Sequence, residues 1–119
     1  MVNNIIEKFS EVTELWSPKI VAEINDQYVK IAKIKGEFVW HNHAQEDEFF
    51  YVVKGEMKIL LKDKEIVLKE NEFYVVPKTV EHCPSAEEEC WIMLVEKKET
   101  QHTGEVVTDK TKSIDEQLY

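Results

Sequence analysis

Arginine is absent from this sequence, so all 15 of its basic residues are lysines, set against 24 aspartates and glutamates. The net charge of -9 argues against nucleic-acid or anionic-membrane partners, because both require a basic face. Without guanidinium groups, the chain also lacks the bidentate contacts that commonly hold phosphate and carboxylate ligands. We therefore expect neither a nucleic acid nor a membrane among the partners.

Cysteine, glycine, proline and long apolar runs are also scarce. The chain has two cysteines, three glycines and three prolines, and none of these form a low-complexity linker. No stretch approaches the roughly 20 apolar residues of a membrane-spanning helix, and the first residues lack the pattern of a secretory signal. Two thiols without an export signal are typical of free cysteines in a reducing compartment. We expect a cytoplasmic protein in which residues 1–119 form one domain.

The first 18 residues carry a helical pattern. Over residues 4–16, apolar side chains recur at steps of three and four, at Ile5, Phe9, Val12 and Trp16. Asn4 is a suitable N-cap, and Pro18 ends the pattern because a residue before proline disfavours the helical conformation. The pattern predicts a short N-terminal helix within residues 1–18.

From residue 20 to residue 96 the period of the apolar pattern becomes that of extended chain. Short runs rich in Val, Ile, Phe and Tyr, separated by turn residues, occur at 27–34, 37–43, 48–54, 56–62, 64–68, 72–76 and 91–96. Strands this short and closely spaced favour an antiparallel sandwich or barrel over βαβ units. We therefore predict an all-β barrel at 20–96, followed by an extended C-terminal segment at 97–119.

Alternation within the runs predicts which side chains face the barrel interior. The inward set is Phe50, Val52, Met57, Ile59 and Leu61, and we also assign Trp91, Met93 and Val95 to the core. The opposite parity places three aromatic side chains outside, those of Phe38, Trp40 and Phe49. Residues 49–53 are apolar on both faces, so their outer face must be covered by the N-terminal helix or by a second subunit.

Three histidines and one glutamate are spaced like metal ligands. His41 and His43 lie two residues apart on an expected strand, which places both imidazoles on one face. Glu48 starts the next strand and lies opposite them in a hairpin, and His82 follows a later strand. A His-x-His pair alone also occurs on solvated strands, so the prediction depends on the whole set. Three imidazoles and one carboxylate suit a divalent transition metal with open coordination positions.

This set resembles the two motifs of the cupin superfamily. The first motif is fitted by Gly36, His41, His43, Glu48 and Gly55, although its first gap is one residue shorter than usual. The places of the second motif are taken by Asn71, Pro77, Thr79, His82 and Ala86, so both of its glycines and its asparagine are replaced. Asn71 tolerates a left-handed turn, whereas Thr79 implies an ordinary backbone at that point. All four metal-ligand positions match.

The resemblance implies a single jelly-roll β-barrel of the cupin type with a short N-terminal helix, a metal near one mouth, and a homodimer. The metal can be Zn, Fe, Mn or Ni, and the partner is a small-molecule ligand. One hypothesis is a metalloenzyme that oxidises or isomerises a small organic substrate, like phosphomannose-isomerase-like cupins. The alternative is a non-catalytic small-ligand binding or sensor module with a structural metal. No residue stands out as a proton carrier, and an empty barrel would leave the four spaced ligands unexplained.

Overall fold

The structure is a computed structural model that describes residues 2–98. Within these residues it consists of a helix, α1 (Ile5–Phe9), and the strands β1 (Lys19–Ile24), β2 (Gln27–Glu37), β3 (Glu48–Lys54), β4 (Met57–Leu61), β5 (Glu65–Leu68), β6 (Phe73–Val76) and β7 (His82–Lys97). No helix in this range is long and apolar enough to cross a membrane. The predicted all-β fold is confirmed. The C-terminal segment expected at 97–119 lies outside the described residues from residue 99 onward.

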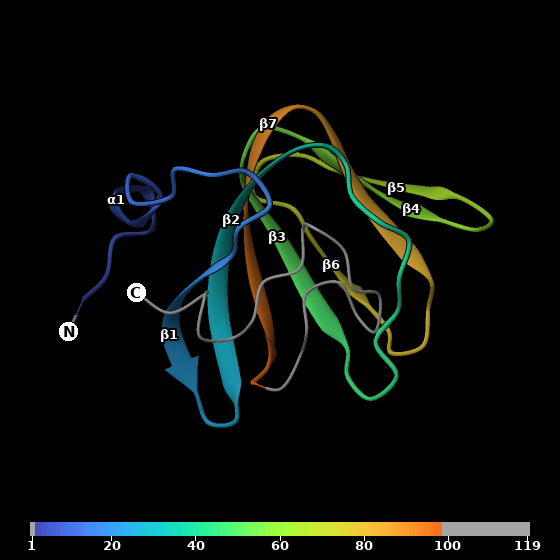
Figure 1. The fold of residues 1–119 in the computed structure, drawn as a ribbon, viewed down its shortest axis with the longest axis horizontal. Coiled ribbons are helices and arrows are strands. Elements are labelled where there is room, and N and C mark those ends of the chain that lie inside the picture. Colours follow the sequence, from blue (N-terminus) through green and yellow to red (C-terminus); the bar gives the residue numbers. More distant parts are fainter. Residues whose placement is uncertain (1, 99–119) are drawn as a thin grey trace.

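The long strand β7 closes the sheet into a jelly-roll barrel. Its later residues pair with β2 on one side and β3 on the other, while its first residues, His82–Ser85, pair with β4. All strand pairs are antiparallel, in the order β1-β2-β7-β3-β6, with β5 added to the outer edge of β4. In Figure 1, β7 arches over the top of the view, and β4 and β5 project to the right of β2 and β3.

The predicted strands differ from the structure at three places. The strand expected at 37–43 is absent. The first residues of β7, which could have paired with this segment, already pair with β4. The segment therefore makes only single contacts with β7, such as the His41–His82 bridge. β1 was not predicted, and β7 begins nine residues before the predicted 91–96 strand. Residues 87–89 of β7 are exposed glutamates, so this part of the strand lacks the apolar signal used for the prediction.

Helix α1 spans five residues, much less than the predicted 4–16. Asn4 caps it as expected, because its Oδ1 accepts a hydrogen bond of 3.0 Å from the Glu7 amide. The hydroxyl of Ser10 donates to the Glu7 carbonyl at 2.6 Å at the point where the helix ends. Further along, Leu15 bridges Lys33 of β2, and the Trp16 amide donates to the Lys33 carbonyl at 2.9 Å. The second half of the predicted 4–16 helix is therefore extended, because it pairs with the edge of β2 at Lys33.

Two apolar clusters lie on opposite faces of the sheet. The interior cluster is formed by Ala32, Ile34, Phe50, Val52, Met57, Ile59, Leu68, Val76, Ala86, Cys90, Ile92 and Leu94, with Leu61 packed against it, which confirms the predicted inward set of β3 and β4. The outer cluster centres on Phe9, Val12 and Ile31, with Val53 packed against it. The N-terminal segment thus covers part of the outer face of β3. The sequence predicted that either this segment or a second subunit would do so.

The assignment of Trp91, Met93 and Val95 to the core is wrong. Directly paired residues of adjacent strands share a face, and Phe50 and Val52 of β3 pair with Leu94 and Ile92 of β7. The inward side chains of β7 are therefore those of Cys90, Ile92 and Leu94, and Trp91 and Met93 pack in the outer cluster. Both cysteines are buried, and no disulfide joins them in the described part of the chain.

Phe38 is also misplaced by the sequence prediction, whereas Trp40 and Phe49 lie outside as predicted. Trp40 is 36% exposed and Lys62 lies over its ring, and Phe49 contacts Phe73 on the outer surface. Phe38 is buried beside His41 and stacks on Trp16, with ring centroids 4.5 Å apart. Because residues 38–47 form no strand, simple alternation from β2 does not apply to them.

Candidate metal centre

Four buried side chains converge inside one end of the barrel: His41, His43, Glu48 and His82. Their ligand atoms all lie within 4.8 Å of one another, so together they could hold a metal ion. Glu48 is the first residue of β3, His82 is the first residue of β7, and the other two histidines lie in the loop between β2 and β3. The structure therefore brings together all four residues that the sequence pattern selected.

Backbone contacts, rather than a regular strand, place His41 and His43. The amides and carbonyls of His41 and His82 exchange hydrogen bonds of 3.0 and 2.9 Å, which form an isolated antiparallel bridge. The Thr79 amide donates to the His43 carbonyl at 2.7 Å. Thr79 itself has a φ of 72°, so the expectation of an ordinary backbone at this position is wrong. Asn71, with a φ of 68°, adopts the left-handed conformation that its residue type tolerates.

The hydrogen bonds of two imidazole rings direct their free nitrogens into the cluster. Nδ1 of His41 donates to the Val39 carbonyl at 2.8 Å, and Nδ1 of His82 donates to the Val80 carbonyl at 2.9 Å. A proton on Nδ1 leaves the lone pair on Nε2, which is the arrangement of metal-binding histidines. Nε2 of His41 is buried and has no hydrogen-bond partner among the described residues. A buried lone pair without a partner fits a Lewis acid at this point.

Glu48 supplies the negative charge of the cluster. Its Oε1 lies 3.2 Å from Nε2 of His43 and 3.3 Å from Nε2 of His82. Burial raises the pKa of Glu48, but the contacts of its Oε1 with His43 and His82 more than offset this effect and hold the pKa well below its usual range. Glu48 is therefore anionic near neutral pH, as a carboxylate ligand must be.

The pKa values of two histidines shift in opposite directions. Burial, which has the largest effect, and the neighbouring His82 together lower the pKa of His41 to about 4. Burial also lowers the pKa of His43, but the hydrogen bond and charge of Glu48, with the charge of Glu46, raise it above its ordinary value. His41 is thus ready to donate a lone pair at neutral pH, whereas at His43 a metal must compete with a proton.

Two charged residues next to the cluster were missed by the sequence prediction. Lys30 and Glu96 are both fully buried, and Nζ of Lys30 lies 2.7 Å from Oε1 of Glu96. Burial and the charge of Glu48 raise the pKa of Glu96 well above its usual range, although Lys30 opposes this shift. Alternation along β2 could have identified Lys30 as an inward residue, because it shares its parity with the inward Ala32 and Ile34. Glu96 shares its parity with the inward Cys90, Ile92 and Leu94, whereas the sequence prediction placed the opposite parity of this strand in the core.

A narrow cavity opens beside His41 and Glu48. Its other walls are apolar, formed by Trp16, Pro18, Ala32, Ile34, Phe38, Phe50, Pro84, Ile92 and Leu94. The cavity volume is about 30 Å³, which is room for about one water molecule. The stacked rings of Trp16 and Phe38 form part of its wall, and Trp16 is held by a hydrogen bond of 2.9 Å from its Nε1 to the Lys35 carbonyl. A larger ligand can enter only if side chains around the cavity move.

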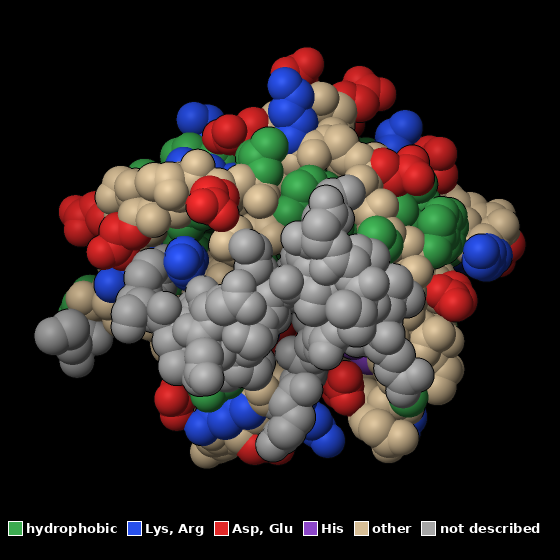
Figure 2. All heavy atoms as spheres, in the orientation of Figure 1, with side chains coloured by type: hydrophobic (Ala, Val, Ile, Leu, Met, Phe, Trp, Pro, Cys, Tyr) green, Lys and Arg blue, Asp and Glu red, His purple; other side chains and the backbone are tan. Residues whose placement is uncertain are grey.

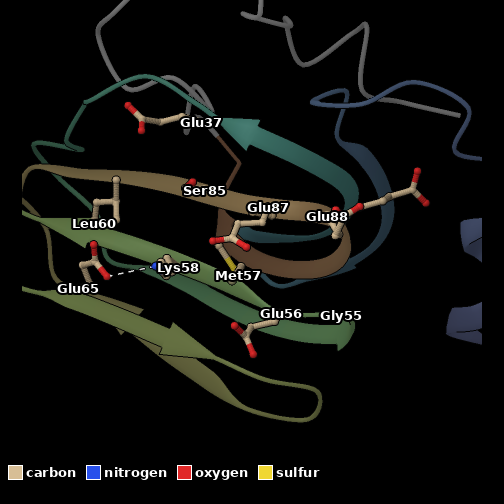
Figure 3. A pocket seen from close by; sticks show the side chains of 12 residues that line it. Glu37, Gly55, Glu56, Met57, Lys58, Leu60, Glu65, Ser85, Glu87 and Glu88 are labelled. Atoms are coloured by element: carbon tan, nitrogen blue, oxygen red, sulfur yellow. Dashed lines mark ion pairs between the residues drawn. The ribbon is translucent and has the colours of Figure 1, made fainter.

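A larger hollow lies apart from the histidines, between β4 and β7 (Figure 3). It has a volume of about 370 Å³, and its acidic lining residues are Glu37, Glu56, Glu65, Glu87, Glu88 and Glu89. Its one lysine, Lys58, forms an ion pair of 3.4 Å with Glu65. None of the four converging residues lines it, so size alone does not make it the functional site.

Comparisons with known proteins agree with this fold. The model of the cupin domain family matches residues 27–96, a range that contains all four converging residues. Protein YdbB of Bacillus subtilis (strain 168) is 39% identical over 82 residues, which is 68% of this chain and 73% of YdbB. A cupin-2 domain containing protein from Shewanella frigidimarina NCIMB 400 is 49% identical, with a TM-score of 0.80, over 81% of this chain and 94% of that one. Protein NMB1881 from Neisseria meningitidis is 28% identical, with a TM-score of 0.75, over 82% and 99% of the two chains. The chain belongs to the cupin family.

Proposed function

We propose that this protein binds one divalent transition-metal ion through His41, His43, Glu48 and His82, and that the ion holds a small organic ligand. The observation that supports the proposal most strongly is the buried Nε2 of His41. This atom has no hydrogen-bond partner within residues 2–98 and lies among three further ligand-type side chains. Imidazole and carboxylate ligands accept Zn, Fe, Mn and Ni, so the donor set restricts the metal to this class without selecting one member.

The chemistry that a bound ion supplies in such a site is polarisation of a carbonyl oxygen or activation of dioxygen. The chain contributes an anionic Glu48 and a neutral His41 that need lose no proton before they bind. The cavity beside the cluster has mostly apolar walls and room for about one water molecule. This arrangement supports oxidation or isomerisation of a small substrate as the reaction class.

The cavity walls favour a compact and mostly apolar ligand with an oxygen donor. Apart from His41 and Glu48, the described residues that line the cavity are apolar, and none of them is a lysine. A phosphate group would find no cation there other than the metal, and the chain has no arginine to supply one. We therefore favour an uncharged substrate or a small carboxylate over a sugar phosphate.

The second candidate is a non-catalytic binding or sensor module in which the ion is structural. The observation that favours it is the small volume of the cavity, about 30 Å³, which leaves little space for a reacting molecule. A structural ion stabilises the folded state through its binding free energy, whether or not a ligand is present.

Elemental analysis and thermal melting test the proposal and separate the two candidates. We expect purified protein to carry one transition-metal ion per chain and to melt at a lower temperature after a chelator removes it. A further rise in melting temperature when small oxygen-donor compounds are added supports a ligand-binding ion. A large loss on chelation without any response to such compounds supports the structural ion. Purified and reconstituted protein that holds no metal contradicts both.

We also propose that the protein is a homodimer. Phe73 of β6 is 61% exposed and Val75 is 43% exposed, and Phe49 of β3 lies against Phe73 with ring centroids 5.4 Å apart. These side chains form an apolar patch on the outer face of the barrel, here called the β3–β6 patch. An exposed patch of this kind is typical of a protein–protein contact.

A further inference from the structure

The buried pair of Lys30 and Glu96 is not explained by stability alone. Both side chains are fully removed from solvent, and apart from their ion pair of 2.7 Å neither has a hydrogen bond of regular geometry in the described part of the chain. Removing two charges from water is costly, and buried ion pairs can often be replaced by apolar residues without loss of stability. The pair therefore calls for another role, and its position suggests one.

The strand register places Glu96 between Lys30 and Glu48. Phe49 of β3 pairs with Val95 of β7, so the next residues along the two strands, Glu48 and Glu96, are neighbours that both point into the barrel. On the other side of β7, Lys30 of β2 pairs with Leu94, next to Glu96 on the same inner face. Three charged side chains thus form a row across three adjacent strands, and this row ends in the cluster that contains His43 and His82.

The row gives Glu48 a neighbour on the side away from the histidines. Glu96 faces Glu48 across the β3–β7 pair inside the barrel, and Lys30 holds Glu96 in place through the 2.7 Å contact. The charge of Glu48 raises the pKa of Glu96, which agrees with the two carboxyl groups being close neighbours. Carboxylate ligands of metal centres are usually held by such outer partners, and removing the partners commonly weakens metal binding 10- to 100-fold.

We propose that Lys30 and Glu96 are positioning residues of the metal centre. Glu96 holds the Glu48 carboxylate in the orientation that presents Oε1 to the histidine nitrogens, and Lys30 fixes Glu96 there. This inference rests on the proposed function, because it assumes that the cluster binds a metal. Its consequence is that the pair sets metal affinity while contributing little to the stability of the metal-free fold.

The test compares an apolar replacement of the pair with the same replacement at a distant pair. In the first variant, Lys30→Met/Glu96→Met, both charges leave the interior together. In the control, Lys58→Met/Glu65→Met, an ion pair of 3.4 Å is removed from the partly exposed β4–β5 edge. The dissociation constant for Co²⁺ is measured by competition with a chelator, the visible spectrum of bound Co²⁺ reports its coordination, and urea unfolding of the metal-free proteins reports stability.

We expect the interior variant to bind Co²⁺ about 10- to 100-fold more weakly, with an altered spectrum and with no loss of metal-free stability. The control keeps the wild-type affinity and spectrum. Wild-type affinity in the interior variant overturns the inference while leaving the metal site itself intact. Absence of Co²⁺ binding by the wild type overturns the proposed function, and the inference with it.

Two single substitutions keep the test decisive if the double variant does not fold. Glu96→Gln retains the length of the side chain and can hydrogen-bond to both neighbours, so Co²⁺ affinity should stay within about threefold of the wild type. Glu96→Asp keeps a carboxyl group but withdraws it by one methylene, so affinity should fall by about fivefold or more. Equal affinities of the Asp and Gln variants contradict a positioning role.

Discussion

At the scale of single residues, Thr79 carries backbone strain next to the loop that holds two residues of the candidate metal centre. It has a φ of 72°, a conformation that β-branched residues rarely adopt, at a position where the family motif has glycine. Its amide donates to the His43 carbonyl at 2.7 Å, so the strained turn is anchored to the loop that carries two histidines. The strain is thus tied to the placement of His43.

Thr79→Gly should raise the free energy of unfolding by about 1 kcal/mol, because relief of the strain exceeds the added entropy of the unfolded chain. Urea denaturation of the metal-free proteins measures this change. The matched control is Thr13→Gly, an exposed threonine without a positive φ, where the same substitution should lower stability. A loss of similar size at both positions contradicts the account of Thr79.

His41 should make the metal-free protein sensitive to acid. Burial lowers its pKa from 6.5 to about 4, so below pH 6.5 the unfolded state binds a proton that the folded state does not. Stability is therefore present above pH 6.5 and falls as the pH drops toward about 4. Across that window, wild-type protein should lose on the order of 3 kcal/mol more stability than His41→Gln. Parallel pH dependences of the two proteins in urea unfolding contradict this prediction.

At the scale of elements, the N-terminal segment stabilises the barrel from outside. Phe9 of α1 is fully buried and stacks on Trp91 of β7, with ring centroids 4.8 Å apart. This contact lies on the opposite face of the sheet from the four converging residues, which are inside. The segment should therefore matter for folding and not for metal binding.

Phe9→Ala should lower the free energy of unfolding by about 3 kcal/mol, the usual cost of truncating a buried phenylalanine. Its Co²⁺ affinity, measured on the folded protein, should equal that of the wild type. The control is Ile6→Ala on the same helix, where a side chain 53% exposed should cost less than about 0.5 kcal/mol. If the Phe9 variant loses metal affinity while folded, the two faces of the sheet are coupled and this description is wrong.

Elements with a regular apolar alternation could be predicted from the sequence, and those shaped by pairing could not. β3, β4, β5 and β6 fall within one residue of the predicted runs, because each alternates between a buried and a more exposed face. The predicted helix was too long because Leu15 and Trp16 pair with β2, a contact that local periodicity does not contain. The four ligand-type residues were predicted by spacing, whereas the role of Glu96 required the register of β7 against β3.

At the scale of the whole molecule, charge and apolar surface are distributed differently. Figure 2 shows acidic and basic side chains interspersed around the visible face, without a basic stripe. The β3–β6 patch, in contrast, gathers exposed apolar side chains, among them Phe73 at 61% exposure. We expect the patch, rather than a charged surface, to mediate self-association.

Phe73→Lys should convert the proposed homodimer into a monomer, because it places a charge in the apolar contact. Sedimentation velocity over a range of concentrations measures the state of association. Val67→Lys, at an exposed valine of β5, is the control and should remain dimeric. A monomeric wild type, or a dimeric Phe73 variant, contradicts the assignment of this surface.

The most direct test of the central claim is the metal content of His43→Ala and Glu48→Gln, measured by elemental analysis on protein shown by circular dichroism to be folded. The wild type and the control Glu56→Gln, in the separate acidic hollow, should each carry one transition-metal ion per chain. Both ligand variants should carry much less, because each loses one of the four converging groups while the interior apolar cluster is retained. Unchanged metal content in both ligand variants would show that these side chains do not hold the ion.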